Sequence, residues 1–334
     1  MARARVLGAA LAVLLLASVV LAITIGPADL APGEVLASML HHLGLGPAPS
    51  SALRDGIVWE LRLPRVLTAA AVGAGLAISG AVMQAVTRNP LADPYLLGLS
   101  GGASLGAVAV LVLGVTALLP PAAFVGALAA LVSTLLIARA AGPLTPARTV
   151  LAGVAVSSIA SAITSLVIFW TATGDSYREI LGWLLGSLAG ARWPAVVISA
   201  AAILVIAVPL SFAGRTLDAF AFGDTAAASL GVNVERTRWT LLVATALLTG
   251  AMVSVSGSIG FVGLVLPHAV RLVVGAANRF VLPLSGLLGA VFLIWADTLA
   301  RTVFDPRELP VGIVTAIVGA PLFVALLVGR RARS

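Results

Sequence analysis

The chain contains no cysteine and no lysine, and its basic residues are all arginine. Without cysteine it cannot form disulfides, thiolate metal sites or a cysteine nucleophile. A phosphate-binding P-loop needs a lysine that reaches the β- and γ-phosphates of the nucleotide. The missing lysine therefore excludes a standard P-loop ATPase.

Charged residues are also scarce, at 10% of the 334 residues, whereas hydrophobic residues make up 60%. A soluble domain carries about 25% charged residues, so this chain has too few to cover a water-facing surface. Lipid must be the solvent for most of it, which predicts an all-α polytopic membrane protein. The net charge of +7 comes from arginines scattered between apolar runs, a pattern that does not indicate a nucleic-acid partner.

Ten apolar runs predict about ten transmembrane helices, since a helix of roughly 20 residues crosses a bilayer. The first run follows Arg3 and Arg5 and is long enough to span, so we interpret it as an uncleaved helix and not as a signal peptide. The whole chain, 1–334, is predicted to form one transmembrane domain. The predicted spans are 6–25, 65–86, 95–113, 121–140, 149–171, 193–212, 239–255, 259–274, 281–303 and 311–328.

The arginines predict that both termini lie in the cytoplasm, because basic residues favour that side of a membrane. With the N-terminus inside, thirteen arginines lie on the inner side and seven on the outer side. The outer seven are Arg54, Arg62, Arg65, Arg178, Arg192, Arg301 and Arg307.

Two polar segments interrupt the apolar runs. The outer one, about 27–63, holds two short amphipathic pieces at 32–43 and 51–61, and His41 and His42 are expected on a solvated face of the first. The longest inner loop is 213–238. In it, Asp224 is a candidate N-cap of a short helix over 225–230, and Gly231 takes the position after its end.

Arginine pairs well with carboxylates in a bidentate geometry. Arg62 and Arg65 precede the second span and Arg301 ends the ninth, so these outer arginines are candidate docking points for an acidic partner. Asp297 lies four residues before Arg301 on the same helical face, and we expect these two side chains to pair.

Several segments together resemble the FecCD-type permeases. The Asn-Pro-Leu-Ala-Asp-Pro and Pro-His-x-x-Arg motifs are the most specific of them, and the set extends over nearly the whole chain in the order that the family has. The matching stretches are 61–65, 79–80, 88–94 with Gly98, 151–153, 183–187, 228–231, 260–271 and 308–312.

This resemblance implies the architecture of a type II ABC importer, built as a homodimer or close heterodimer of ten-helix permeases in the cytoplasmic membrane of a prokaryote. Two cytoplasmic ATPases and an outer substrate-binding protein are the implied partners. ATP and magnesium would bind the ATPases, with no cofactor or metal in this chain. The implied cargo is an iron(III)–siderophore complex, with haem or cobalamin as the alternative.

The resemblance also assigns roles to individual positions. The ATPase-coupling loop corresponds to 223–231, with Gly223, Asp224, Ala228, Leu230 and Gly231. Binding-protein docking corresponds to Arg62, Arg65 and Arg301, and an inner gate to Asn89 and Leu91. A second gate is expected in the loop Leu144-Thr145-Pro146-Ala147-Arg148, which matches the family only in part.

Two other classes of protein fit parts of the pattern. A secondary transporter would also be polytopic, but a proton relay needs deep acidic groups, and Asp297 is the only acid well inside a predicted span. An intramembrane serine protease would use Ser100 of Gly98-Leu99-Ser100-Gly101-Gly102 with His268. That reading leaves the inner loop and the outer arginines unexplained, and an active Ser100→Ala variant would exclude it.

Overall fold

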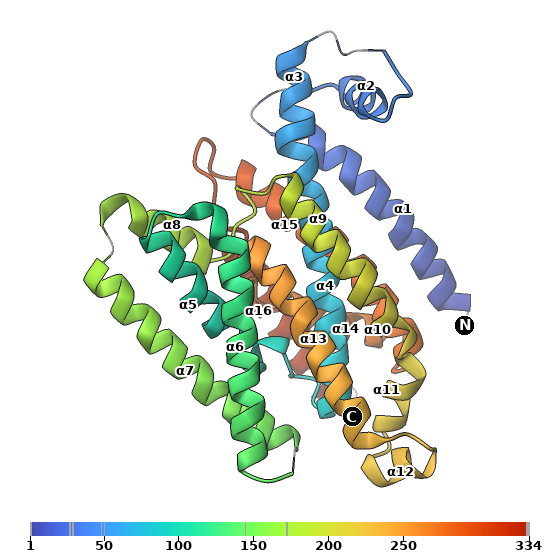
Figure 1. Ribbon diagram of the computed structural model, residues 1–334. Helices are drawn as coiled ribbons and strands as arrows, with labels where there is room; N and C mark the ends of the chain where they lie inside the picture. Colours follow the sequence, from blue (N-terminus) through green and yellow to red (C-terminus); the bar gives the residue numbers. More distant parts are fainter. Residues whose placement is uncertain are drawn as a thin grey trace.

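A computed structural model describes residues 2–331 except Pro27, Asp29, Ala48, Ser50, Leu144 and Ala172. Within these residues every regular element is a helix, and no strand occurs. The long helices form a bundle, with α2 (Pro32–His42) and α3 (Ala52–Gly56) at one end and α12 (Asp224–Ser229) at the other (Figure 1). We call these the α3 end and the α12 end.

The described residues contain a helix at each of the ten predicted spans. Seven helices are long and apolar enough to cross a bilayer, and three apolar helices are shorter. The seven are α1 (Ala2–Thr24), α3 continued by η1 (Ile57–Arg62) and α4 (Leu63–Thr87), η3 (Thr116–Leu118) with α6 (Leu119–Ala140), α7 (Pro146–Thr171), α9 (Trp193–Ala202) continued by η4 (Ile203–Ala207) and α10 (Val208–Phe212), α13 (Val234–Ser256), and α15 (Asn278–Thr302). The shorter three are α5 (Leu99–Val112), α14 (Val262–Val274) and the apolar part, Val311–Ala325, of α16 (Val311–Arg331).

Five prolines lie inside described helical segments, and a π-helical turn precedes two of them, Pro64 and Pro209. Proline lacks an N–H and its ring clashes with the carbonyl four residues earlier, so it usually breaks a helix. The π-helices η1 and η4 end two residues before Pro64 and Pro209, and their wider turns leave room for the ring. The outer piece at 51–61 and the span at 65–86 were predicted as separate elements. They form one continuous helix of 36 residues, Ala52–Thr87.

Helix α4 lies at the centre of the bundle and packs against α1, α9, α13, α14 and α15. Glycines allow the closest of these approaches. A Cβ atom at Gly73 would lie 2.1 Å from the carbonyl oxygen of Gly289 in α15, and one at Gly80 would lie 1.9 Å from that of Gly263 in α14. Small residues bring helix backbones together in this way in membrane proteins.

We expect Gly73→Ala to destabilise the folded chain by about 1–3 kcal/mol, because its methyl group has no space against α15. Thermal unfolding of the purified chain measures this. The matched control is Gly182→Ala in α8 (Gly174–Leu184), where an added Cβ meets nothing within 4 Å. Equal melting temperatures for the two variants would contradict the close approach of α4 and α15.

The short helices α5 and α14 each follow a segment that is not α-helical, and these two segments contact each other. The 3₁₀ turn η2 (Pro94–Leu97) places the Tyr95 hydroxyl 3.1 Å from both the backbone nitrogen and the carbonyl oxygen of Ile259. Ser100 and Ser258 share a hydrogen bond of 2.7 Å. Irregular backbone in a membrane protein needs such partners inside the protein.

Two features of the shorter elements were not predicted. Helix α8 carries the fully buried Ile180, and α11 (Gly214–Phe220) precedes α12. His42 is exposed, as expected. Its ring also stacks on Trp59 at a centroid distance of 4.0 Å, and its Nε2 lies 3.0 Å from Asp55.

Candidate functional site

The loop after α4 is held in one conformation by its own side chains. Arg88 ends α4 in a left-handed conformation, with φ of 53°. The side-chain oxygen of Asn89 accepts a hydrogen bond of 2.9 Å from the backbone of Leu91, a local turn that asparagine favours. The side chain of Leu91 is 47% exposed. The two predicted gate residues are thus neighbours in one turn, 88–93, which we call the gate loop, and their gating role stays a prediction.

Asp93 closes this loop by capping η2, and its carboxylate accepts a hydrogen bond of 2.8 Å from the backbone of Tyr95. Burial raises the pKa of Asp93 to about 6, against the lowering effect of this hydrogen bond. A carboxyl group whose pKa is higher in the folded state than in the unfolded state stabilises the fold most at low pH. That contribution is lost as the pH rises through about 6.

We therefore expect Asp93→Asn, which keeps a capping oxygen but cannot ionise, to gain stability relative to the unmodified chain between pH 5 and pH 8. Melting temperatures across that range measure the difference. Glu179→Gln, which removes an exposed carboxyl group on α8, is the control. A difference between Asp93→Asn and the unmodified chain that stays constant with pH would contradict the assignment.

Helix α12 begins one residue earlier than predicted and has a different cap. Gly223, with φ of 96°, is the N-cap, and Asp224 is the first helical residue. Instead of capping, the Asp224 carboxylate lies 2.8 Å from Nη2 of Arg238 in α13 and 3.7 Å from Nη2 of Arg88 in the gate loop. Asp224 therefore connects α12 to both neighbouring elements. Gly231 follows the helix with φ of 84°, as predicted.

Two large apolar side chains flank α12 and are open to solvent. Phe222 is 78% exposed and Leu230 is 68% exposed, whereas Ala227 of the helix itself is fully buried. Exposed apolar groups at the end of a bundle are suited to contact with another protein. Leu230 belonged to the predicted coupling loop, and Phe222 was missed, although an aromatic residue in a polar loop is a visible signal.

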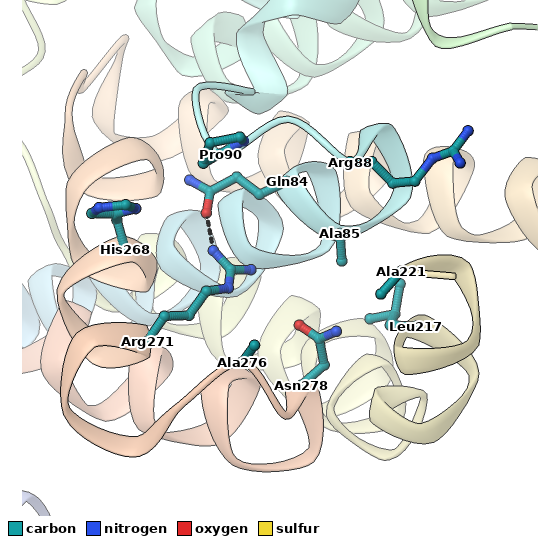
Figure 2. A pocket seen from close by; sticks show the side chains of 10 residues that line it. All are labelled: Gln84, Ala85, Arg88, Pro90, Leu217, Ala221, His268, Arg271, Ala276 and Asn278. Atoms are coloured by element: carbon teal, nitrogen blue, oxygen red, sulfur yellow. Dashed lines mark hydrogen bonds between the residues drawn. The ribbon is translucent and has the colours of Figure 1, made fainter. Parts of the chain in front are cut away.

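A cavity of about 380 Å³ opens between the gate loop, α11, α14 and the start of α15. Figure 2 shows Gln84 and Arg271 facing each other in it, while the guanidinium of Arg88 points away from them. Arg271 donates to the Gln84 side-chain oxygen, and the Gln84 side-chain nitrogen donates to the carbonyl of Leu264 at 3.0 Å. These bonds join α4 to α14 beside the predicted gate.

The predicted second gate lies before α7. Leu144 is outside the described residues. In the remainder of this loop, Thr145 accepts a hydrogen bond of 3.4 Å from the backbone of Arg148, and Arg148 donates to the carbonyl of Pro143 at 2.9 Å.

At the α3 end, the three predicted docking arginines are buried in this chain, with exposed fractions of 6% for Arg62, 8% for Arg65 and 5% for Arg301. Arg62 donates to backbone carbonyls at the end of α1 and just after it, those of Ile23 at 2.8 Å and Ala28 at 2.9 Å. Arg301 donates to the carbonyl of Ala22. The docking role of the three arginines stays a prediction, and within this chain Arg62 and Arg301 connect η1 and α15 to α1.

The expected pairing of Asp297 with Arg301 was wrong. Asp297 accepts two hydrogen bonds from Arg65, one of 2.8 Å from Nε and one of 2.9 Å from Nη2. The bidentate geometry across two packed helices satisfies both carboxylate oxygens, which a partner four residues along the same helix does not achieve. Asp297 is therefore neutralised inside the protein, and its side chain is 2% exposed.

The arginines border a cavity of about 320 Å³ at the α3 end, which also includes Arg192 and Glu308. Arg192 is exposed and donates to the carbonyl of Ala191 at 3.0 Å. The sequence placed Arg192 on the outer side but gave no reason to group it with Arg62, Arg65 and Arg301. Which residues lie beside Arg192 depends on how the turn between α8 and α9 folds.

Ser100, the nucleophile of the protease alternative, shares a hydrogen bond of 2.7 Å with Ser258, a second hydroxyl with no basic character. Among the described residues no group of three or more histidines, cysteines and acids could hold a metal ion.

Comparison with known proteins identifies the family. The FecCD transport family matches residues 14–329. The chain is 43% identical to the vitamin B12 import system permease protein BtuC of Vibrio cholerae, over 88% of this chain and 89% of that protein. It is 40% identical to the hemin transport system permease protein HmuU of Yersinia pestis, over 82% and 84% of the two chains.

The fold matches as well. A solved inward-facing structure of an ABC transporter assigned to the metal-chelate type superposes with a TM-score of 0.86 at 30% identity, covering 97% of this chain and 99% of that one. The whole-chain match in sequence and fold shows that this chain belongs to the FecCD transport family, as a multi-pass membrane permease subunit of an ABC importer and not itself an enzyme.

Proposed function

We propose that the chain imports a metal chelate across the cytoplasmic membrane, with the α12 end in the cytoplasm and the α3 end outside. The excess of arginine toward the α12 end supports this orientation. The family match over residues 14–329 is the observation that carries the importer function. Asp297 is paired with Arg65 and so gives no support to a proton relay, which leaves ATP as the energy source.

A cytoplasmic ATPase would dock at α12. The exposed Phe222 and Leu230 supply apolar contact area on either side of the helix. Asp224 and Arg88 would transmit movement of α12 to the gate loop, where Asn89 and Leu91 open and close the inner exit. Gly223, Ala228 and Gly231 belong to the same docking segment.

An outer substrate-binding protein would dock at the α3 end through acidic side chains facing Arg62, Arg65 and Arg301. A second permease subunit would complete the pathway, and the helices that line it would present small Gly, Ala, Ser and Thr side chains to the cargo. Such a lining has few groups that select one chelate, so selectivity would lie with the binding protein.

The cargo we propose is an iron(III)–siderophore complex. The relatives named for vitamin B12 and hemin support the broader class, since both molecules are metal chelates. They also make cobalamin and haem the second candidates.

The test is deletion of the gene for this permease, followed by uptake of radiolabelled iron–siderophore, hemin and cobalamin by the cells. Loss of siderophore uptake alone, restored by the intact gene, supports the proposal. Loss of cobalamin or hemin uptake alone would move the cargo to that ligand, and normal uptake of all three would contradict the metal-chelate assignment.

A further inference from the structure

The guanidinium of Arg65 is shared by two carboxylates that differ in exposure. Nε and Nη2 bind Asp297, whose side chain is 2% exposed. Nη1 binds Glu308 at 2.7 Å, and the Glu308 side chain is 44% exposed. The pair with Asp297 is enclosed by α4 and α15, whereas the pair with Glu308 faces solvent and is held by a side chain from the α15–α16 connection.

Glu308 is also the one acid that lines the 320 Å³ cavity among the described residues. Four arginines line it: Arg62, Arg65, Arg192 and Arg301. Arg301 is 5% exposed, and its buried Nε–H has no hydrogen-bond acceptor in the described part of the chain. The cavity thus has more guanidinium groups than carboxylates, and the Arg301 Nε–H is a buried donor without an acceptor among the described residues. Such a site is suited to binding an additional carboxylate.

An entering carboxylate cannot reach Arg65 on its Asp297 side, because both oxygens of Asp297 occupy that edge. It can reach Nη1 only where Glu308 now binds. Glu308 precedes α16 by three residues, and the first turn of α16 is tightly packed. The Gly312 nitrogen donates to the carbonyl of Gly186 at 3.2 Å, and a Cβ at Gly312 would lie 1.9 Å from the Leu185 oxygen.

We propose that Glu308 is an internal occupant of the docking cavity, and that an acidic side chain of the outer binding protein displaces it from Arg65. This inference rests on the proposed docking of that protein at the α3 end. The exchange replaces one ion pair by another, so the charge of Arg65 stays compensated. It also releases the segment that enters α16, and so connects docking to the position of that helix.

The test measures the affinity of the purified binding protein for the permease–ATPase complex in lipid nanodiscs. In Glu308→Gln the internal competitor for Arg65 is lost and the side-chain volume is kept. Because a partly exposed ion pair is worth up to about 1 kcal/mol, we expect about two- to fivefold tighter binding. Glu60→Gln removes an exposed acid at the same end outside the cavity, and we expect it to leave the affinity unchanged.

A second measurement covers the case in which Glu308→Gln is unstable. Since the chain has no cysteine, spin labels on Leu53→Cys and Phe304→Cys, two exposed positions, report the distance between α3 and the released segment. We expect this distance distribution to change when the binding protein docks. Unchanged or weaker binding by Glu308→Gln, or a distribution unaffected by docking, overturns the exchange while the docking itself stands. Failure of the unmodified complex to bind the protein overturns both.

Discussion

Replacing Arg65 with methionine is expected to destabilise the folded chain by about 3–5 kcal/mol, the usual cost of leaving one member of a buried ion pair alone. The substitution leaves Asp297 with its side chain 2% exposed and without the two hydrogen bonds that Arg65 donates. The buried carboxylate then loses its direct ion-pair partner. The measurement is the unfolding free energy of the purified chain in detergent micelles.

Two further variants distinguish the cost of breaking the buried Arg65–Asp297 pair from the general cost of removing an arginine. Arg54→Met removes a pair with Glu34 in which the arginine side chain is 51% exposed, and we expect a change below about 1 kcal/mol. The double variant Arg65→Met with Asp297→Leu removes both charges, so it should recover most of the loss. A single Arg65→Met variant that is no less stable than Arg54→Met would contradict the buried pair.

Substituting Leu230 with aspartate is expected to lower ATP-driven uptake at least about tenfold. Burying a leucine side chain in an interface is worth about 1.5–3 kcal/mol, and a carboxylate in the same place must also lose its water. The fold should be kept, because Leu230 is 68% exposed and its neighbour Ala227 supplies the buried contact. The direct measurement is the affinity of the partner ATPase for the purified permease.

The control for this prediction is Leu53→Asp in α3. It makes the same chemical change on a side chain that is 77% exposed, at the opposite end of the bundle. We expect ATPase affinity to be unchanged there. Equal loss of ATPase affinity in both variants, or none in Leu230→Asp, would show that α12 is not the ATPase contact.

The spans were predictable because each is a continuous run of apolar residues, and such a run is visible in the sequence without knowledge of the fold. The continuity of Ala52–Thr87 was not predictable in this way. Pro64 indicates a boundary, but a π turn precedes it and the helix continues.

The partners of the buried charges were harder to predict than the helices. Asp297 has Arg301 within one helical turn, and the local rule chose that pair. The true partner, Arg65, lies 232 residues earlier and is brought in by the packing of α4 on α15. Rules that relate only nearby residues also gave no reason to group Glu308 and Arg192 with the docking arginines.

The gate loop and α12 could be predicted in part. Asn89, Pro90 and Asp93 indicate a tight turn from their residue types alone. Gly231 likewise indicated where α12 ends. The connection of the two elements through Asp224 and Arg88 depends on the tertiary structure, since the two residues are 136 positions apart in the sequence.

The most direct test of the central claim is uptake by proteoliposomes that contain the permease with its ATPase, supplied with the binding protein outside and ATP inside. We predict that labelled iron–siderophore accumulates only when ATP, the ATPase and the binding protein are all present. Accumulation without the ATPase, driven by a proton gradient or membrane potential alone, would contradict the account.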